Sequence, residues 1–489
     1  MSEDKASNPH PAYAGLETKR DVYRAVYGGT DSIRKTSTAN LPKYPAESDP
    51  EYQVRLGCAT IDGLVLGGVE QLCGSVFEGE IDTEKVHATL KPYLENVDNK
   101  GNHFNIFARE AFRASFEGFS LILVDMPTAT ATDLADQKKK GLRPYLNLYP
   151  ASSVINWRYR VNPVSKQKEL TLLVLMEVSS EAVDRFSVAD VTRYRVFEVN
   201  NSVVTWELWK ETGEGKDKQL VKEDDGMIEK ITAIPAAFIG DVMDDPKLLV
   251  ESRLEIKAYQ KESSFDAIEY LQMPTFVTKG YEGEETLKLG ASAHLKLPAD
   301  PAADAFYMQM DAAGHDSLKK SIAEIKDHIK ARVNYLITSA SEKTATQANI
   351  EDRDKQARLI VWADELKDAL ERALQFMGQF VGLGEDQAGE IVLVTSWSNA
   401  KLVMTAEDVT AESNLVTEGL ESLETFVEKR YAAGLLPEGV DVKTELERID
   451  KEMEKNAGIK PVVEAGKMPN EGQVNADETN KTEPEAIAT

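Results

Sequence analysis

The sequence has little cysteine: Cys58 and Cys73 are the two such residues among 489. No Cys-x-x-Cys pair occurs, and the six histidines are scattered with no metal-binding spacing. Disulfide frameworks and zinc sites need several such residues at short, regular spacings. We therefore expect two buried thiols in a reducing cytoplasm, with no metal and no cofactor.

Long apolar runs are absent as well. No stretch of the chain approaches the roughly 20 apolar residues that cross a bilayer. The first 15 residues, MSEDKASNPHPAYAG, are acidic and polar, unlike a signal peptide. We therefore expect a soluble protein that is made in the cytoplasm and has no membrane partner.

Motifs of common enzyme classes are missing. The chain has no Gly-x-Ser-x-Gly elbow and no Walker A phosphate loop. The segment SLILVD at 120–125 has the form of a strand whose final Asp125 could hold magnesium, but without a phosphate loop a buried strand is favoured. Gly67 and Gly68 are interpreted as close-packing positions, since no strand precedes them. We predict no catalytic residue and no enzymatic activity.

Acidic residues outnumber basic ones, 83 against 57, so the net charge is −26. Protein surfaces that bind nucleic acid tightly over an extended area are basic, because their lysines and arginines neutralise the phosphates. The composition argues against such a surface, but it leaves room for a local ring of lysines or arginines that touches DNA lightly. With 42% hydrophobic residues the chain is otherwise typical of globular proteins.

Residues 1–240 contain helical patterns followed by β patterns. Residues 1–50 look irregular, and a cap at Ser48 or Asp49 introduces a helix over 52–76. Further helices are expected at 83–97 and 102–119 and a strand at 120–125. From 144 to 240, alternating and β-branched runs predict strands, with a hairpin turn at Asn200-Asn201. The three tryptophans of this part are interpreted as core or sheet-face residues: Trp157, Trp206 and Trp209.

The most regular pattern lies at 315–383. Apolar residues recur there at helical spacing in two stripes, separated by a small, polar break. The two helices form either an ordinary αα-hairpin or one long rod bent around a loop that faces a partner. The first stripe is Leu318, Ile322, Ile325, Ile329, Val333 and Leu336, and the second is Leu359, Ala363, Leu366, Leu370, Ala373, Met377 and Val381.

Charged residues accompany this pattern and the segment before it. Lysines lie beside and beyond the first stripe, where they form either a solvated face balanced by nearby acids or a surface for a partner. Before them, a helix that begins after Asp244-Asp245-Pro246 reaches about residue 271, and residues 274–312 form a compact β insert. Three acids on one turn of this insert suit solvent or a partner surface.

The C-terminal part is expected to hold a strand at 390–399, two helices within 407–455, and an acidic tail. The tail has no aromatic residue after residue 456. Such a composition cannot bury enough apolar surface to offset the entropy of ordering, so we expect the tail to be disordered.

The order of elements resembles the portal proteins, or head-to-tail connectors, of tailed bacteriophages. A mixed α/β part precedes a helix with Tyr259, Ser263 and Ser264, and a small β insert with a turn at Gly280 follows. A lysine-bearing helix, a small polar loop, a long helix and terminal helices complete the succession. The resemblance covers most of residues 10–455.

Short motifs carry the same resemblance. One portal-like family opens with His-Pro-x-Tyr, here His10-Pro11-Ala12-Tyr13. Its Tyr-Leu-Pro-like element corresponds to Asn40-Leu41-Pro42, and its later strand to MPTFVTKG at 273–280. Its Thr-Ala loop corresponds to Thr344-Ala345, which follows Lys343 where relatives often carry an acid.

The resemblance implies an α+β, portal-type fold with a wing, a helical stem, a small β-rich clip and a C-terminal helical crown. It assigns an irregular arm to 1–50, the wing to 51–246 and 350–400, stem helices to 247–271 and 315–338, the clip to 272–314, a channel loop to 339–349, the crown to 401–455 and the disordered tail to 456–489.

The implied function is structural. Portal proteins form homo-oligomeric rings, typically of twelve subunits, at one vertex of the capsid, and double-stranded DNA is packaged and ejected through the ring. The implied partners are the terminase motor, a tail adaptor protein, the major capsid or scaffolding protein, and DNA, which places the protein in the virion. The alternative is a capsid-associated or cellular scaffold or adaptor ring without DNA passage.

The implied site residues follow from this assignment. A ring repeats each lysine in every subunit, and a mostly acidic wall lets DNA slide. The DNA-channel residues are Lys319, Lys320, Lys326, Lys330 and Lys343; the channel loop is Ser339, Ala340, Ser341, Glu342, Thr344, Ala345, Thr346 and Gln347; the clip partner surface is Glu282, Glu284 and Glu285.

Overall fold

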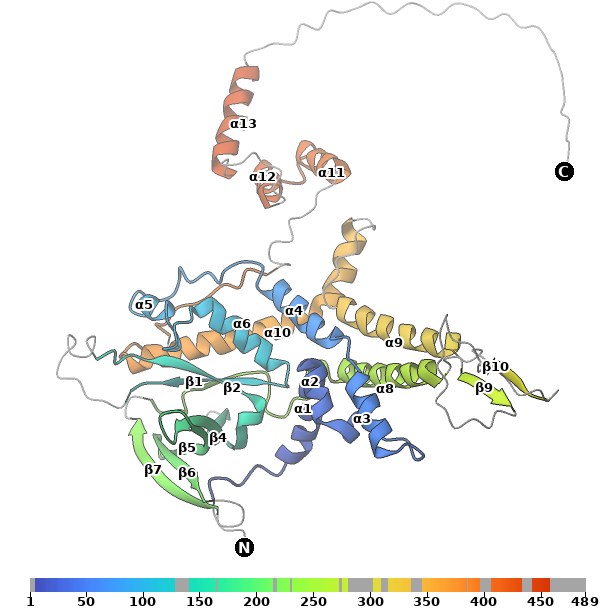
Figure 1. Cartoon of the computed structure of the whole chain (residues 1–489). Coiled ribbons are helices and arrows are strands. Elements are labelled where there is room, and N and C mark those ends of the chain that lie inside the picture. Colours follow the sequence, from blue (N-terminus) through green and yellow to red (C-terminus); the bar gives the residue numbers. More distant parts are fainter. Residues whose placement is uncertain are drawn as a thin grey trace, which may run out of the picture. The chain divides into compact units, whose positions relative to one another are not determined.

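A computed structural model gives the fold (Figure 1). The chain divides into two units, Met1–Ala400 and Lys401–Thr489, and the division falls where the expected crown begins. The structure describes residues 5–127, 140–163, 166–213, 218–228, 231–271, 275–279, 302–308, 315–335, 345–384, 386–395, 406–432 and 442–457.

The N-terminal segment is helical, contrary to the expected irregular arm. Helices α1 (Tyr13–Tyr27) and α2 (Gly29–Lys35) precede the short 3-10 turn η1 (Ser37–Ala39). The apolar pattern is hard to recognise in α1 because Arg20 lies on its buried face and is fully buried. Its guanidinium lies over the Phe119 ring, 5.2 Å from the centroid.

The expected helix over 52–76 is two helices, α3 (Asp49–Cys58) and α4 (Leu64–Val76). Ser48 begins α3 with a capping box that includes Glu51. The chain turns before α4 at Gly63, whose φ of 74° is unfavourable for other residues. Because Cys58 lies at the exposed end of α3, only Cys73 is buried, and the expectation of two buried thiols is wrong for Cys58.

The next helix is shorter than expected, and its aromatic stripe is buried. Turns and the four-residue α5 (Lys91–Leu94) occupy the segment where a helix over 83–97 was expected. Helix α6 (Phe104–Ser115) leads into strand β1 (Ser120–Asp125). Its apolar face is buried as the spacing predicts: Phe104, Phe107, Ala108, Ala111, Phe112 and, just beyond the helix, Phe116.

Two antiparallel sheets follow from the β-rich part of the sequence. Strand β1 pairs with β2 (Tyr145–Pro150) and β8 (Ala236–Ile239) in the order β2-β1-β8. After turn η2 (Ala151–Ser153), the second sheet is β3 (Val154–Val161), β4 (Lys168–Ala182), β5 (Val188–Asn200), β6 (Val203–Thr212) and β7 (Gln219–Ile228), in chain order.

The predicted hairpin joins β5 and β6, one residue later than expected. Asn200 pairs with Val203, and the two turn residues are Asn201 and Ser202. Both have positive φ, 52° and 64°, which matches the twist of a tight two-residue hairpin.

Strand β1 lies between two hydrophobic cores. Ile122 and Val124 pack with the helical core, while Leu121 and Leu123 pack with residues of the five-stranded sheet. Successive side chains of a strand point to opposite faces, so a continuous apolar run serves both cores. Helix α10 (Ala345–Phe380) lies along this sheet together with α6 (Figure 1).

The remaining elements of the first unit are α8 (Leu249–Leu271), β9 (Thr275–Lys279), β10 (Asp304–Met308) and α9 (His315–Tyr335). β9 and β10 pair antiparallel. At 390–399 the expected strand is reduced to one bridge, Val392 with Asp82, within the described residues up to 395. The observed class is therefore α+β.

The second unit contains three described helices, where two were expected. They are α11 (Ala406–Thr417), α12 (Leu423–Ala432) and α13 (Val442–Ala457). Gly419, with φ of 73°, and Leu420 follow α11 and separate it from α12. Residues 458–489, most of the expected tail, lie outside the described part of the chain.

Candidate functional site

Helices α8 and α9 lie in the two segments for which stem helices were expected, 247–271 and 315–338, and they pack side by side (Figure 1). The apolar stripe of α9 faces inward: Ile322, Ile329 and Val333 are buried. Helix α4 packs on the same pair. At this contact a Cβ added to Gly68 would lie 3.0 Å from Cγ1 of Val333. The close-packing interpretation is therefore confirmed for Gly68, whereas Gly67 has open space around it.

Lys326, a predicted channel residue, is instead tied to its own chain. Its ammonium group forms ion pairs with Asp62, at 2.6 Å, and with Glu262. Burial lowers the pKa of Lys326, but the two carboxylates outweigh this effect and hold the pKa above its ordinary value. The lysine therefore joins α9 to α8 and to the turn before α4.

The other predicted lysines of α9 lie on its outer face. Lys319, Lys320 and Lys330 are exposed. Acidic residues are interleaved with them on the same helix, so this face carries charges of both signs. The exposed acids are Asp316, Glu324 and Asp327.

Two further sets of predicted residues lie mainly outside the described residues. They include Lys343, the clip acids Glu282, Glu284 and Glu285, and the loop residues Ser339, Ala340, Ser341, Glu342 and Thr344. The structure differs from the loop prediction at Ala345, Thr346 and Gln347, which form the first turn of α10. The polar break is thus shorter than predicted, because its last residues include the good helix formers Ala345 and Gln347.

A buried carboxylate missing from the sequence prediction caps α4. Glu255 of α8 is 1% exposed and accepts hydrogen bonds from the backbone N–H groups of Leu64, at 2.7 Å, and Val65, at 2.8 Å. Helix N-termini leave such N–H groups without intrahelical partners, and Gly63 supplies no side-chain cap. A helix that begins after a glycine, with no capping side chain of its own, indicates that a more distant residue caps it. The sequence does not show that this residue is Glu255.

The pKa of Glu255 reflects this burial. Removal from water raises the pKa of its carboxyl above the ordinary value, because burial disfavours the charged form by more than the backbone N–H groups restore. Burial also raises the pKa of Glu262, and the nearby charges of Asp62 and Asp266 add to the effect. Acidic groups therefore outnumber the lysine here: Asp62 and Glu262 contact Lys326, and the charge of Asp266 acts on Glu262.

Two more polar contacts join α8 to α9. Arg332 donates through Nε to Glu251, at 2.6 Å. Lys261 donates to the hydroxyl of Ser321, at 2.5 Å. These contacts and the Lys326 ion pairs are distributed along the two helices. They brace the pair against sliding.

The residues that carry the resemblance on α8 anchor the segment near 40–55. Tyr259 is buried with Leu41 and Ala59. Ser263 accepts a 3.4 Å hydrogen bond from Arg55, and Ser264 is hydrogen-bonded to the hydroxyl of Tyr44. These residues hold neighbouring helices on α8.

The Asp125 carboxylate, considered above for magnesium, serves a contact between the two sheets. It accepts from Arg195 at 2.8 Å and from the hydroxyl of Tyr145 at 3.2 Å. Arg195 also pairs with Glu177 at 2.9 Å. Across the described ranges, no cluster of three or more His, Cys, Asp or Glu is arranged to hold a metal ion.

Membrane insertion has no candidate element in the part of the chain that the structure describes: none of the helices there is both long and apolar enough to span a bilayer. The longest, α10, has 36 residues but carries charged residues throughout. It packs along β1 and β8.

Comparison with known proteins gives one family match. Residues 250–381 match a family described as a domain of unknown function (DUF4055). The match begins at the second residue of α8 and ends just after α10, so it contains β9, β10 and α9 and excludes the three-stranded sheet, the five-stranded sheet and the C-terminal unit. A search of curated proteins gives no match.

Proposed function

We propose that the protein is a portal-type ring subunit: several copies enclose a channel at one capsid vertex, and double-stranded DNA passes through it during packaging and ejection. In this role the ring docks the terminase motor and later a tail adaptor, and it contacts the major capsid or scaffolding protein. The finer fold assignment of wing, stem, clip and crown belongs to the same proposal.

The observation that carries this proposal is the unit formed by α8, β9, β10 and α9. Two long helices pack along each other, and an antiparallel pair of strands separates them in the sequence. A stem with a clip requires this order. The family match covers the same four elements and continues through α10. This supports the treatment of α8, β9, β10, α9 and α10 as one evolutionary unit.

Electrostatics are compatible with a sliding duplex. A net charge of −26 disfavours strong retention of phosphates, while exposed lysines on α9 provide weak local attraction. A ring multiplies each lysine by the number of subunits. Lys319, Lys320 and Lys330 are the described lysines that this proposal uses, and Lys326 is reassigned to bracing.

One observation favours the second candidate, a scaffold or adaptor ring without DNA passage. Acids and lysines alternate on the exposed face of α9, as they do on an ordinary solvated helix. A face of this kind would suit a protein partner as well as a channel. The two candidates differ in the width of the ring and in its response to charge.

Charge reversal of α9 tests the choice. We expect Lys319→Glu, Lys320→Glu and Lys330→Glu, combined, to leave ring assembly intact and to change the rate of DNA packaging. The matched control reverses three exposed acids of the same helix: Asp316→Lys, Glu324→Lys and Asp327→Lys. Rings that package DNA at an unchanged rate with both triple variants would contradict channel contact by this face and favour the second candidate.

A further inference from the structure

The β4–β5 hairpin extends beyond the sheet that carries it. β3 pairs with residues 168–175 of β4, and β6 pairs with residues 193–200 of β5. Over 176–192, the two strands pair with each other and with no third strand among the described residues. We call this segment the ribbon. A two-stranded ribbon is marginally stable in water by itself, so it needs support at its base or along its length.

Ion pairs tie the ribbon to the sheet, from its base at Arg193 to Glu181 near the end of β4. Arg193 pairs with Glu181 across the strands and with Glu223 of β7, at 2.6 Å. Lys210 of β6 adds a 3.0 Å contact to Glu181. The hydroxyl of Ser180 donates to Asp190 at 2.7 Å. The ribbon therefore leaves the sheet in a defined direction.

The tip of the ribbon is ordered and apolar. Asp184 accepts hydrogen bonds from the backbone N–H groups of Phe186, at 2.7 Å, and Ser187, at 2.9 Å. This turn presents Phe186 with 86% of its surface exposed. Large exposed apolar groups that cluster at one place mark interaction surfaces. Val183 and Val188 lie beside Phe186 at the tip, 68% and 69% exposed, while Val178, 61% exposed, lies nearer the base, where it pairs with Thr192.

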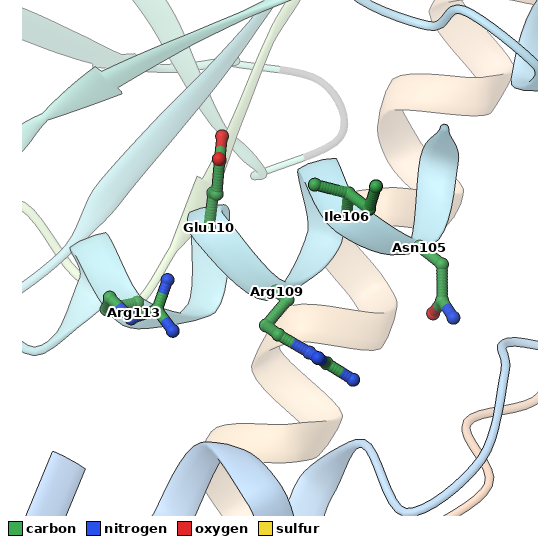
Figure 2. Close-up of a pocket in the computed structure, with 5 residues that line it drawn as sticks. All are labelled: Asn105, Ile106, Arg109, Glu110 and Arg113. Carbon is green, nitrogen blue, oxygen red and sulfur yellow. The ribbon is translucent and has the colours of Figure 1, made fainter. Parts of the chain in front are cut away.

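A groove on α6 combines an apolar side chain with charged side chains, as the ribbon tip does. Figure 2 shows its five lining side chains, all of which project from this one helix. Its volume is about 170 Å³, similar to the roughly 150 Å³ cavity that accommodates benzene in an engineered protein. Ile106 is 52% exposed there. The groove is lined by Asn105, Ile106, Arg109, Glu110 and Arg113.

Charges in the groove complement those of the ribbon tip. Arg109 and Glu110 form no ion pair within the described residues, and neither does Arg185 at the tip. Arg113, by contrast, is held by Glu70 at 2.8 Å, which fixes one wall of the groove. Charges of both signs therefore lie at both surfaces, Asp184 and Arg185 at the tip and Arg109 and Glu110 in the groove. Within the chain, Asp184 accepts the hydrogen bonds of the turn, and Arg185 and Arg109 lie over the Phe186 and Phe77 rings, 5.1 and 5.5 Å from the centroids.

We propose that the ribbon tip of one copy docks into the α6 groove of an adjacent copy. Phe186 fills the groove against Ile106, Arg185 pairs with Glu110, and Asp184 pairs with Arg109. The two surfaces differ, so the contact is heterologous and repeats around a closed ring. This inference rests on the proposed function, which requires lateral contacts between copies, and it identifies one of them.

Assembly of the full chain, followed by mass photometry across a concentration series, tests the contact. We expect Phe186→Ala to weaken assembly at least about tenfold, as for a buried aromatic anchor. The control Val54→Ala removes a similarly exposed side chain, 67% exposed on α3, and should leave assembly unchanged. Circular dichroism of each variant checks that the chain remains folded.

A charge exchange distinguishes a direct contact from a general effect. Arg185→Glu and Glu110→Arg should each weaken assembly by about tenfold, a cost of about 1.4 kcal/mol, and the double variant should restore it. Both changes leave the Asp184 turn intact. Two additive losses without restoration would overturn the pairing.

Crosslinking gives the decisive result. In a Cys58→Ser background, Val188→Cys with Asn105→Cys keeps Phe186, Ile106 and the charged pairs in place and should give an oxidation-dependent ladder of multiples of 54.1 kDa, and either cysteine alone should not. If the wild type forms rings, the double-cysteine variant gives no ladder and Phe186→Ala has no effect on assembly, this contact is overturned and the proposed function still stands. A wild-type chain that stays monomeric overturns both. Loss of a capsid protein from Phe186→Ala rings that are otherwise intact also overturns self-docking.

Discussion

Two helical contacts in the first unit are stabilised in different ways. Helix α10 packs through apolar side chains, with Leu366, Leu370 and Met377 fully buried in the main core. Helix α9 packs on α8 with fewer fully buried residues and several ion pairs. The hydrophobic effect is non-directional, whereas charge-assisted hydrogen bonds require a particular geometry. We infer that α10 supplies stability and that the α8–α9 pair supplies a defined, rigid arrangement.

The largest effect is expected from truncation in the apolar contact. Leu366→Ala should lower the free energy of unfolding by about 3 kcal/mol, because it removes buried methyl groups and leaves a cavity. Val361→Ala on the same helix, where the side chain is 54% exposed, should change it by less than about 0.5 kcal/mol. Urea denaturation followed by tryptophan fluorescence measures both. Equal effects would mean that α10 is not stabilised by this face.

Removal of the distant cap should have the next largest effect. Glu255→Ala leaves the part-buried N–H group of Leu64 and the buried N–H group of Val65 without acceptors, which should cost about 2 kcal/mol. Glu269→Ala, at an exposed position of α8, is the matched control and should be near neutral. Hydrogen exchange at Leu64 and Val65 should accelerate in the first variant alone. Unchanged exchange would show that Glu255 does not cap α4.

A comparison of Lys326 with Lys330 tests the polar contact between α8 and α9, because the two lysines are four residues apart on the same helix. Lys326→Ala should destabilise the protein by about 1 kcal/mol, because it leaves Glu262 and Asp62 without their counter-ion. Lys330→Ala should have no measurable effect on stability, since its side chain is exposed. Thermal unfolding compares them directly, and equal melting temperatures would remove Lys326 from the brace.

The contributions of two buried carboxyl groups to stability should change with pH in opposite directions. The folded-state pKa of Glu255 is raised by burial, so the folded state binds more protons than the unfolded state just above the ordinary carboxyl pKa. Its contribution is favourable at low pH and is lost as the pH rises through the raised pKa. The stability of the wild type relative to Glu255→Gln should therefore fall from pH 4 towards pH 7.

Asp98 is the control of opposite sign. Burial acts to raise its pKa, but hydrogen bonds from the backbone N–H of Lys100 and from the side chain and N–H of Asn102 outweigh burial and lower it. Its contribution is present above the ordinary pKa and is lost as the pH falls. The stability of the wild type relative to Asp98→Asn should therefore fall on acidification. The same slope for both pairs would contradict these assignments.

Apolar periodicity predicted the buried faces well. The stripes of α6, α9 and α10 are buried where they are described, apart from half-buried residues such as Leu318, Ile325 and Val381. Spacing along one helix determines such a face, so the sequence contains the necessary information. The mixed α+β class and the hairpin at the end of β5 follow from similarly local patterns.

The roles of charged residues could not be predicted in the same way. Lys326 and Lys330 look equivalent beside the stripe, but Lys326 meets Asp62, which lies 264 residues earlier in the chain. Arg20 concealed α1, because a buried arginine interrupts an apolar stripe. Glu255 caps a helix that lies 190 residues before it. Each of these contacts depends on the tertiary fold, which local sequence patterns do not contain.

A class-averaged top view of the purified full-length protein by electron microscopy tests the central claim most directly. The proposal predicts closed rings, with a mass many times 54.1 kDa and a central hole wide enough for duplex DNA. A monodisperse monomer at high protein concentration would contradict the ring, and rings with a hole too narrow for a duplex would contradict the passage of DNA.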